Sequence, residues 1–100
     1  MHVGPIDGAV YARREDVVLR EVAGEQLLVP IRNDPAAMQA IFALTGTGVF
    51  VWGLLDGERP LEAIRALLLE RYDVAPEEAE ADLSAFIERL GAAGLVESRR

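Results

Sequence analysis

The sequence contains no cysteine and no lysine, and its single histidine, His2, lies next to the N-terminus. Without cysteine there is no disulfide framework, no thiolate metal site and no cysteine nucleophile. Without lysine there is no phosphate-binding loop of the GxxxxGK[ST] type, although the segment TGTG at 45–48 is glycine-rich. Ser84 has no usable histidine for a catalytic triad. We therefore expect no enzyme activity, no metal site and no cofactor.

The chain also lacks a basic excess and a long apolar run. Its net charge is −7, with 17 acidic and 10 basic residues, whereas nucleic-acid-binding proteins usually carry a basic stripe. The most apolar stretch, 44–57, is shorter than the ~20 residues that a membrane-spanning helix needs. The first ten residues lack the basic start and apolar core of a signal peptide. We expect a cytoplasmic protein whose 100 residues form one domain, with 1–8 as a flexible arm.

Three segments in the first half of the chain have strand character. Residues 16–22 are rich in β-branched side chains and, after a turn at 23–25, residues 26–31 continue as a second strand, which predicts an antiparallel hairpin. Pro30 cannot donate a ladder hydrogen bond, so it should lie near the strand end or on an edge. Apolar alternation at 38–44 predicts a third strand.

Three helices are expected after these strands. The first, 49–55, would be capped by Thr45 or Thr47 and stopped by Gly57. It is apolar on all sides, so it should be covered on all sides, with Phe50, Trp52, Leu54 and Leu55 at the centre of the core. Amphipathic helices follow at 60–72 and from Pro76 onwards, each with proline in its first turn. The stripe of the last helix is Ala79, Leu83, Phe86, Ile87 and Leu90.

This order of elements predicts an α+β fold of winged-helix-turn-helix type, with a three-stranded antiparallel sheet followed by three helices. Leu95 and Val96 would form a short final strand or an apolar latch. Glu77, Glu78, Glu80 and Asp82 crowd the start of the last helix, where they complement its dipole rather than form a catalytic pair.

An exposed sheet edge can accept an extended peptide as an added strand. If 38–44 is that edge, the last helix would wall the other side of a groove. The alternative is that Phe42 and Phe86 are ordinary core residues. Positions 78, 82, 85 and 89 share one helix face next to Phe86.

The run Leu44, Gly48, Trp52 and 54–57 is similar to the L-N-x-x-G-x-x-x-W-x-L-L-D-G signature of the pyrroloquinoline quinone biosynthesis protein D family (PqqD-like proteins). The fold of that family is also called the RiPP precursor peptide recognition element. The resemblance continues at 62–64, at Asp82-Leu83, Phe86-Ile87 and Leu90, and at 94–96. Thr45 stands where the family usually has asparagine, but threonine can also cap a helix.

The resemblance implies a non-catalytic protein that binds the leader of a ribosomally made precursor peptide. It would present the leader to a radical-SAM maturase or another modifying enzyme. The leader would add as a strand beside the third strand and against the last helix. The peptide-binding residues implied are Gln39, Ala40, Ile41, Phe42 and Ala43 on the strand side, and Asp82, Ala85, Phe86 and Arg89 on the helix side.

Two other classes of function stay open. A winged-helix DNA-binding or regulatory domain would have a similar order of elements, although the net charge argues against DNA. A small enzyme would need catalytic candidates that the chain does not offer. Self-association through the open edge would compete with peptide binding, so a homodimer is a further expectation.

Overall fold

The computed structural model describes residues 8–31 and 42–99. The turn predicted at 32–36, the first part of the third strand and all but one residue of the N-terminal arm lie outside these residues. The described elements are β1 (Val10–Arg13), β2 (Val17–Val22), β3 (Glu25–Pro30), β4 (Phe42–Leu44), α1 (Gly46–Leu54), β5 (Asp56–Pro60), α2 (Leu61–Arg71), α3 (Pro76–Ala92) and β6 (Val96–Ser98).

The predicted hairpin is confirmed as β2 and β3, which pair antiparallel from Val17–Pro30 to Val22–Glu25. Ala23 and Gly24 form its turn, and both have positive φ, +53° and +83°. Two successive residues with positive φ are what a two-residue hairpin turn of type I′ requires. Pro30 ends β3, as expected. The strand β4 then pairs with β3, so the order of this sheet is β2-β3-β4.

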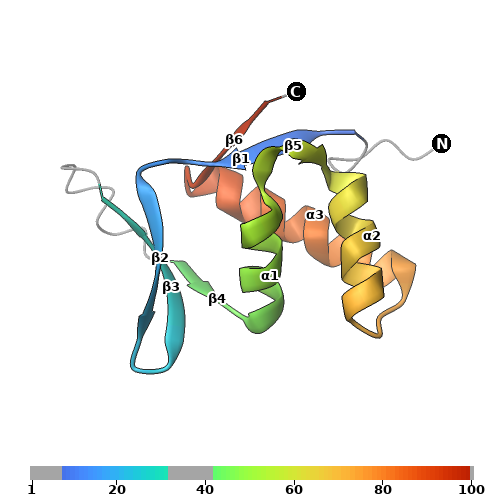
Figure 1. The fold of residues 1–100 in the computed structure, drawn as a ribbon, viewed down its shortest axis with the longest axis horizontal. Helices are drawn as coiled ribbons and strands as arrows, with labels where there is room; N and C mark the ends of the chain where they lie inside the picture. Colours follow the sequence, from blue (N-terminus) through green and yellow to red (C-terminus); the bar gives the residue numbers. More distant parts are fainter. Residues whose placement is uncertain (1–7, 32–41, 100) are drawn as a thin grey trace.

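A second antiparallel sheet, in the order β5-β1-β6, was not predicted. Only a short connection, 14–16, separates β1 from β2, so the chain passes directly from this second sheet into the sheet of the hairpin (Figure 1). The expectation of a single sheet ahead of three helices is therefore wrong in its strand count, while the α+β class is confirmed. Of the second sheet, only β6 was considered, as one outcome for Leu95 and Val96.

Of the two predicted caps of α1, Thr45 is the one that forms, because its side chain accepts a hydrogen bond from the backbone N–H of Gly48, so the helix begins at Gly46 rather than at the predicted residue 49. Its end differs, since the cap is Leu55 and not Gly57. Gly57 instead lies in β5 with a φ of +80°, and a Cβ there would come 3.2 Å from the Cβ of Ala12. Glycine at this position thus permits the close approach of β5 to β1 rather than stopping the helix.

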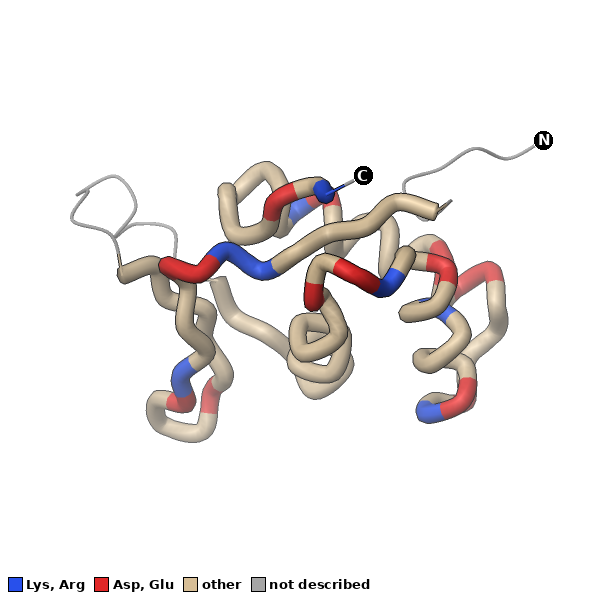
Figure 2. Tube along the Cα trace, turned by 45° about the horizontal axis from the view of Figure 1, so that its top comes forward, with Lys and Arg blue, Asp and Glu red and all other residues tan. Residues whose placement is uncertain are grey.

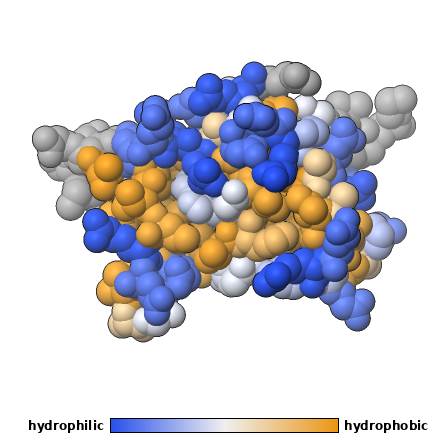
Figure 3. Space-filling view, in the orientation of Figure 1, coloured by the Kyte–Doolittle hydropathy of each residue, from blue (hydrophilic) through white to orange (hydrophobic). Residues whose placement is uncertain are grey.

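The expected complete burial of α1 is also wrong. Val51, Trp52 and Leu55 are buried, but Phe50 and Leu54 are only half-buried. An apolar band crosses this face of the molecule from the β2–β3 hairpin over α1 to α2 (Figure 3). The helix carries no charged residue and lies between segments that do (Figure 2).

The two amphipathic helices form as predicted and complete the core. Pro60 is the N-cap of α2 rather than its first residue, and Pro76 is the first residue of α3. All five residues of the predicted α3 stripe are buried. The residues with essentially no exposed surface come from strand β3, helices α2 and α3, and the connections that follow α1 and α3: Leu28, Leu55, Leu61, Ile64, Leu83, Leu90 and Leu95.

Candidate functional site: a groove between β4 and α3

A hollow of about 360 Å³ opens between β4, the first turns of α1 and the middle of α3. Apolar side chains form much of its lining, and two charged side chains of α3 join them. The lining residues are Phe42, Ala43, Leu44, Thr45, Thr47, Gly48, Val51, Leu68, Asp82, Leu83, Ala85, Phe86 and Arg89.

Phe42 is held in the groove by two contacts from α3. Its ring meets the ring of Phe86 edge to face, with centroids 6.3 Å apart and planes inclined at 65°. The guanidinium carbon of Arg89 lies 5.9 Å from the centroid of the Phe42 ring, within the range of a cation–π contact. Phe86 is buried, whereas Phe42 is half-buried and keeps part of its surface toward the groove.

The first turn of α1 closes one end of the groove. Thr45 orients this turn through its cap, in which the backbone N–H of Gly48 lies 3.2 Å from the Thr45 Oγ1. A Cβ at Gly48 would lie 3.4 Å from Leu44 Cδ2 and 3.5 Å from Phe86 Cζ. The helix therefore packs closely against β4 and α3 at the same point.

The strand β4 offers a backbone edge beside this hollow. It pairs with β3 through Phe42–Leu28, Ala43–Leu27 and Leu44–Gln26. Among residues 8–31 and 42–99, no strand pairs with its other edge. An unpaired edge presents backbone N–H and C=O groups that an extended chain can satisfy.

The structure brings together six of the nine residues predicted as peptide-binding. Phe42 and Ala43 lie on β4, and Asp82, Ala85, Phe86 and Arg89 line the facing side of α3. Gln39, Ala40 and Ile41 lie outside the described residues. Their role remains a prediction, as does that of the other six.

Sequence reasoning missed the part of the lining that comes from the start of α1 and from α2. Thr45 was predicted only as a helix cap, and Gly48 was noted only as part of the glycine-rich segment and of the family signature. The spacing of Leu44, Thr45 and Gly48 was the available signal, because residues around a helix start lie next to the strand that precedes it.

Four of the six charged residues of α3 fall into two groups. Glu77 and Glu78 are exposed in the first turn, where carboxylates favour the positive end of the helix dipole. Asp82 and Arg89 are also exposed but face the groove. Within the described part of the chain, no group of histidine and acidic side chains is arranged to hold a metal ion.

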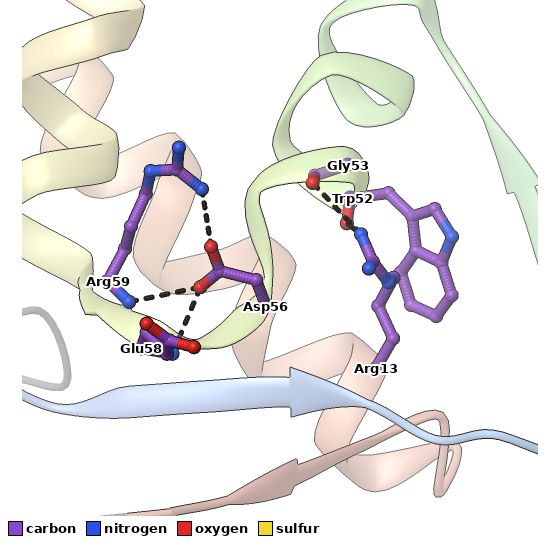
Figure 4. A network of polar contacts seen from close by, with 6 residues as sticks. All are labelled: Arg13, Trp52, Gly53, Asp56, Glu58 and Arg59. Atoms are coloured by element: carbon purple, nitrogen blue, oxygen red, sulfur yellow. Dashed lines mark hydrogen bonds and ion pairs between the residues drawn. The ribbon is translucent and has the colours of Figure 1, made fainter.

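A polar network at the far end of α1 supports the fold rather than the groove (Figure 4). Arg13 donates from Nη1 to the backbone oxygens of Trp52, at 3.1 Å, and Gly53, at 2.9 Å. Asp56 Oδ1 accepts from the backbone N–H groups of Arg59 and Glu58, both at 3.0 Å. These hydrogen bonds, with the adjacent Arg59 guanidinium, hold the pKa of Asp56 below its ordinary value of 3.8.

No described helix has the length and apolarity to cross a membrane. Among curated proteins, no relative matches this chain. One solved structure that does match is that of "TbiB1 in Complex with the TbiA(beta) Leader Peptide". The two chains share 28% identity and a TM-score of 0.67, over 86% of this chain and 94% of the other.

A family model supplies the second comparison. The model of coenzyme PQQ synthesis protein D matches residues 16–96. This range includes both strands of the hairpin, all three helices and every residue that lines the groove. The chain therefore belongs to the PqqD family.

Proposed function

We propose that this protein captures the leader of a ribosomally synthesised precursor peptide in the groove between β4 and α3. The leader adds as a strand to β4, so that its backbone pairs with the groups that point to the open edge of Phe42–Leu44. Alternate side chains of such a strand point to the same side and enter the hollow. The residues proposed to bind are Gln39, Ala40, Ile41, Phe42, Ala43, Asp82, Ala85, Phe86 and Arg89.

The observation that carries this proposal is the coincidence of an unpaired strand edge with an apolar hollow on one side of it. Main-chain hydrogen bonds supply affinity in strand addition, and side-chain pockets supply specificity. The matched structure, TbiB1, is a complex with a leader peptide. Membership of the PqqD family favours the same function for this chain.

The proposal takes residues 1–100 as one recognition domain that works in the cytoplasm and catalyses no reaction itself. A peptide-modifying enzyme, such as a radical-SAM maturase, acts on the leader-bound precursor. The recognition domain holds the precursor near that enzyme and so raises its effective concentration. No cofactor or metal is needed for this role.

A winged-helix DNA-binding or regulatory domain is the second candidate, since it rests on the order of strands and helices. The acidic charge of the chain argues against binding to DNA. The chain has a net charge of −7, and α3 carries five acidic residues against one arginine. Such a helix repels the phosphate backbone of DNA. Self-association through the edge of β4 would occupy the same backbone groups as the leader, so a homodimer would compete with peptide binding.

An amide NMR titration with the leader of the nearest encoded short peptide tests the proposal. We expect shifts concentrated in 42–44 and 82–90 at sub-millimolar peptide. A scrambled leader is the matched control, and equal shifts with it would indicate nonspecific binding to the edge of β4 rather than a specific site. Unmoved groove amides in the folded protein would contradict the proposal. A salt-dependent gel shift with duplex DNA would instead support the second candidate.

A further inference from the structure

The groove carries charges of opposite sign at its two ends, and three contacts of α3 indicate which charge lies at which end. Arg89 lies at the Phe42 end, 5.9 Å from the centroid of that ring. Phe86 lies in the middle, since it contacts Phe42 and also approaches Gly48. Asp82 lies about one turn beyond Phe86, on the side away from Arg89. The groove therefore has a positive end beside the start of β4 and a negative end beside the start of α1.

Both charges are available to a ligand. Asp82 and Arg89 are exposed, and neither forms an ion pair with another described residue. They lie about two turns apart on α3, or ~10.5 Å along the helix axis, so they do not neutralise each other. One turn before Asp82, Glu78 is exposed on the same helix face and adds to the negative end.

The direction in which a peptide runs along β4 determines which of its residues lie next to Asp82 and which lie next to Arg89. The sheet β2-β3-β4 is antiparallel throughout. Antiparallel pairing is also slightly more stable than parallel pairing. A peptide that runs antiparallel to β4 enters at the Leu44 end, next to Asp82, and leaves at the Phe42 end, next to Arg89.

From this geometry we infer that the protein selects peptides with a basic residue, then an apolar residue, then an acidic residue at alternate positions from N- to C-terminus. The first and third of these positions are four residues apart, which spans ~13 Å of strand and brings both charges within side-chain reach of their partners. The apolar residue enters the hollow against Phe42 and Phe86. This inference rests on the proposed function, because it names the class of peptide that the same groove takes.

Two isomeric synthetic peptides, TVRTFTEVT and TVETFTRVT, test it with the full-length protein. Their compositions are identical and only the order of the two charges differs. We expect the base-first peptide to bind about three- to tenfold more tightly, because two exposed ion pairs replace two like-charge contacts. Its advantage should shrink as salt screens the charges. Amide shifts in 42–44 and 82–90 give the dissociation constants and report the location of binding.

Two variants complete the design. The double variant Asp82→Arg with Arg89→Glu should prefer the acid-first peptide. The neutral variant Asp82→Asn with Arg89→Gln should bind both peptides equally, because it removes the two charges that cause the preference. Reversal of the preference supports the inference, since a general loss of affinity could not produce it.

The failures are distinguishable. If the wild-type groove amides move equally with both peptides, or more with the acid-first peptide, the inferred pattern is wrong while strand addition in the groove still stands. If neither peptide moves the groove amides and the encoded leader also fails to do so, the proposed function falls together with the inference. If the encoded leader alone binds there, the inferred pattern is wrong and the proposed function stands.

Discussion

The ring of Phe42 on β4 meets the ring of Phe86 on α3 edge to face, with centroids 6.3 Å apart. This contact joins the strand that offers an open edge to the helix that walls the groove. Phe86 is 8% exposed and belongs to the core, whereas Phe42 is half-buried and lines the hollow. One aromatic pair thus links the stability of the fold to the shape of the site.

Truncation of these two rings should have unequal effects on stability. Phe86→Ala should lower the free energy of unfolding by about 3–5 kcal/mol, because it leaves a cavity in the core. Phe42→Ala should cost less, about 1 kcal/mol, because part of its ring is already exposed in the folded protein. Chemical denaturation of both variants and of the double variant measures their coupling, for which we expect about 0.5–1.5 kcal/mol. Additive costs would show that the ring contact contributes nothing of its own.

Trp52 should be the most sensitive position of α1. It is 5% exposed, and Trp52→Ala should cost about 3–5 kcal/mol, which is comparable to the whole stability of many small domains. We therefore expect loss of the cooperative thermal transition. Phe50→Ala on the same helix is the matched control, because Phe50 is only half-buried and its truncation should leave a cooperative melt. An unchanged melting temperature for Trp52→Ala would contradict this account of the core.

Arg13 should stabilise the end of α1. Its guanidinium donates to two carbonyl groups in the last turn of that helix, those of Trp52 and Gly53, where a positive charge is also favoured by the negative end of the helix dipole. Arg13→Met keeps the aliphatic length and should cost about 1 kcal/mol in chemical denaturation. Arg20→Met, an exposed arginine on β2, is the control and should change the stability little. Equal costs for the two variants would mean that the hydrogen bonds to α1 are not the cause.

Asp56 should make the stability depend on pH on the acid side. Folding lowers its pKa below 3.8, first through the hydrogen bond from the Arg59 N–H and then through that from Glu58. The ionised carboxylate therefore stabilises the fold above pH 3.8, and this contribution is lost as the pH falls through the folded-state pKa.

Asp56→Asn should flatten the acid-side dependence of stability, which denaturation curves across this range would show. Glu58→Gln serves as the control, because the Glu58 side chain takes no part in these hydrogen bonds, and it should leave the dependence as in the wild type. A carbon-detected NMR titration of the Asp56 carboxyl would contradict the prediction if its midpoint lay at or above the ordinary value.

The failures of sequence-based prediction have a common physical origin. Asp56–Pro60 contains glycine, proline and three charged residues, a composition that disfavours strands. It is a strand because β1 lies beside it and pairs with it. Nothing in the sequence around Arg13 indicates its hydrogen bonds to Trp52 and Gly53, which form because β1 lies beside the end of α1. Contacts between segments remote in the sequence decided both cases.

What the sequence determined by itself is local. The hairpin with its Ala23-Gly24 turn, the Thr45 cap, the proline-led helices and the buried stripe of α3 follow from conformational preference and periodicity over a few residues. The tertiary structure decided which surfaces meet: the second sheet, the half-exposed face of α1 and the groove that joins β4, α1 and α3. Conformational preference acts between neighbours in the chain. A groove depends instead on the relative placement of elements tens of residues apart, which the packing of the whole core fixes.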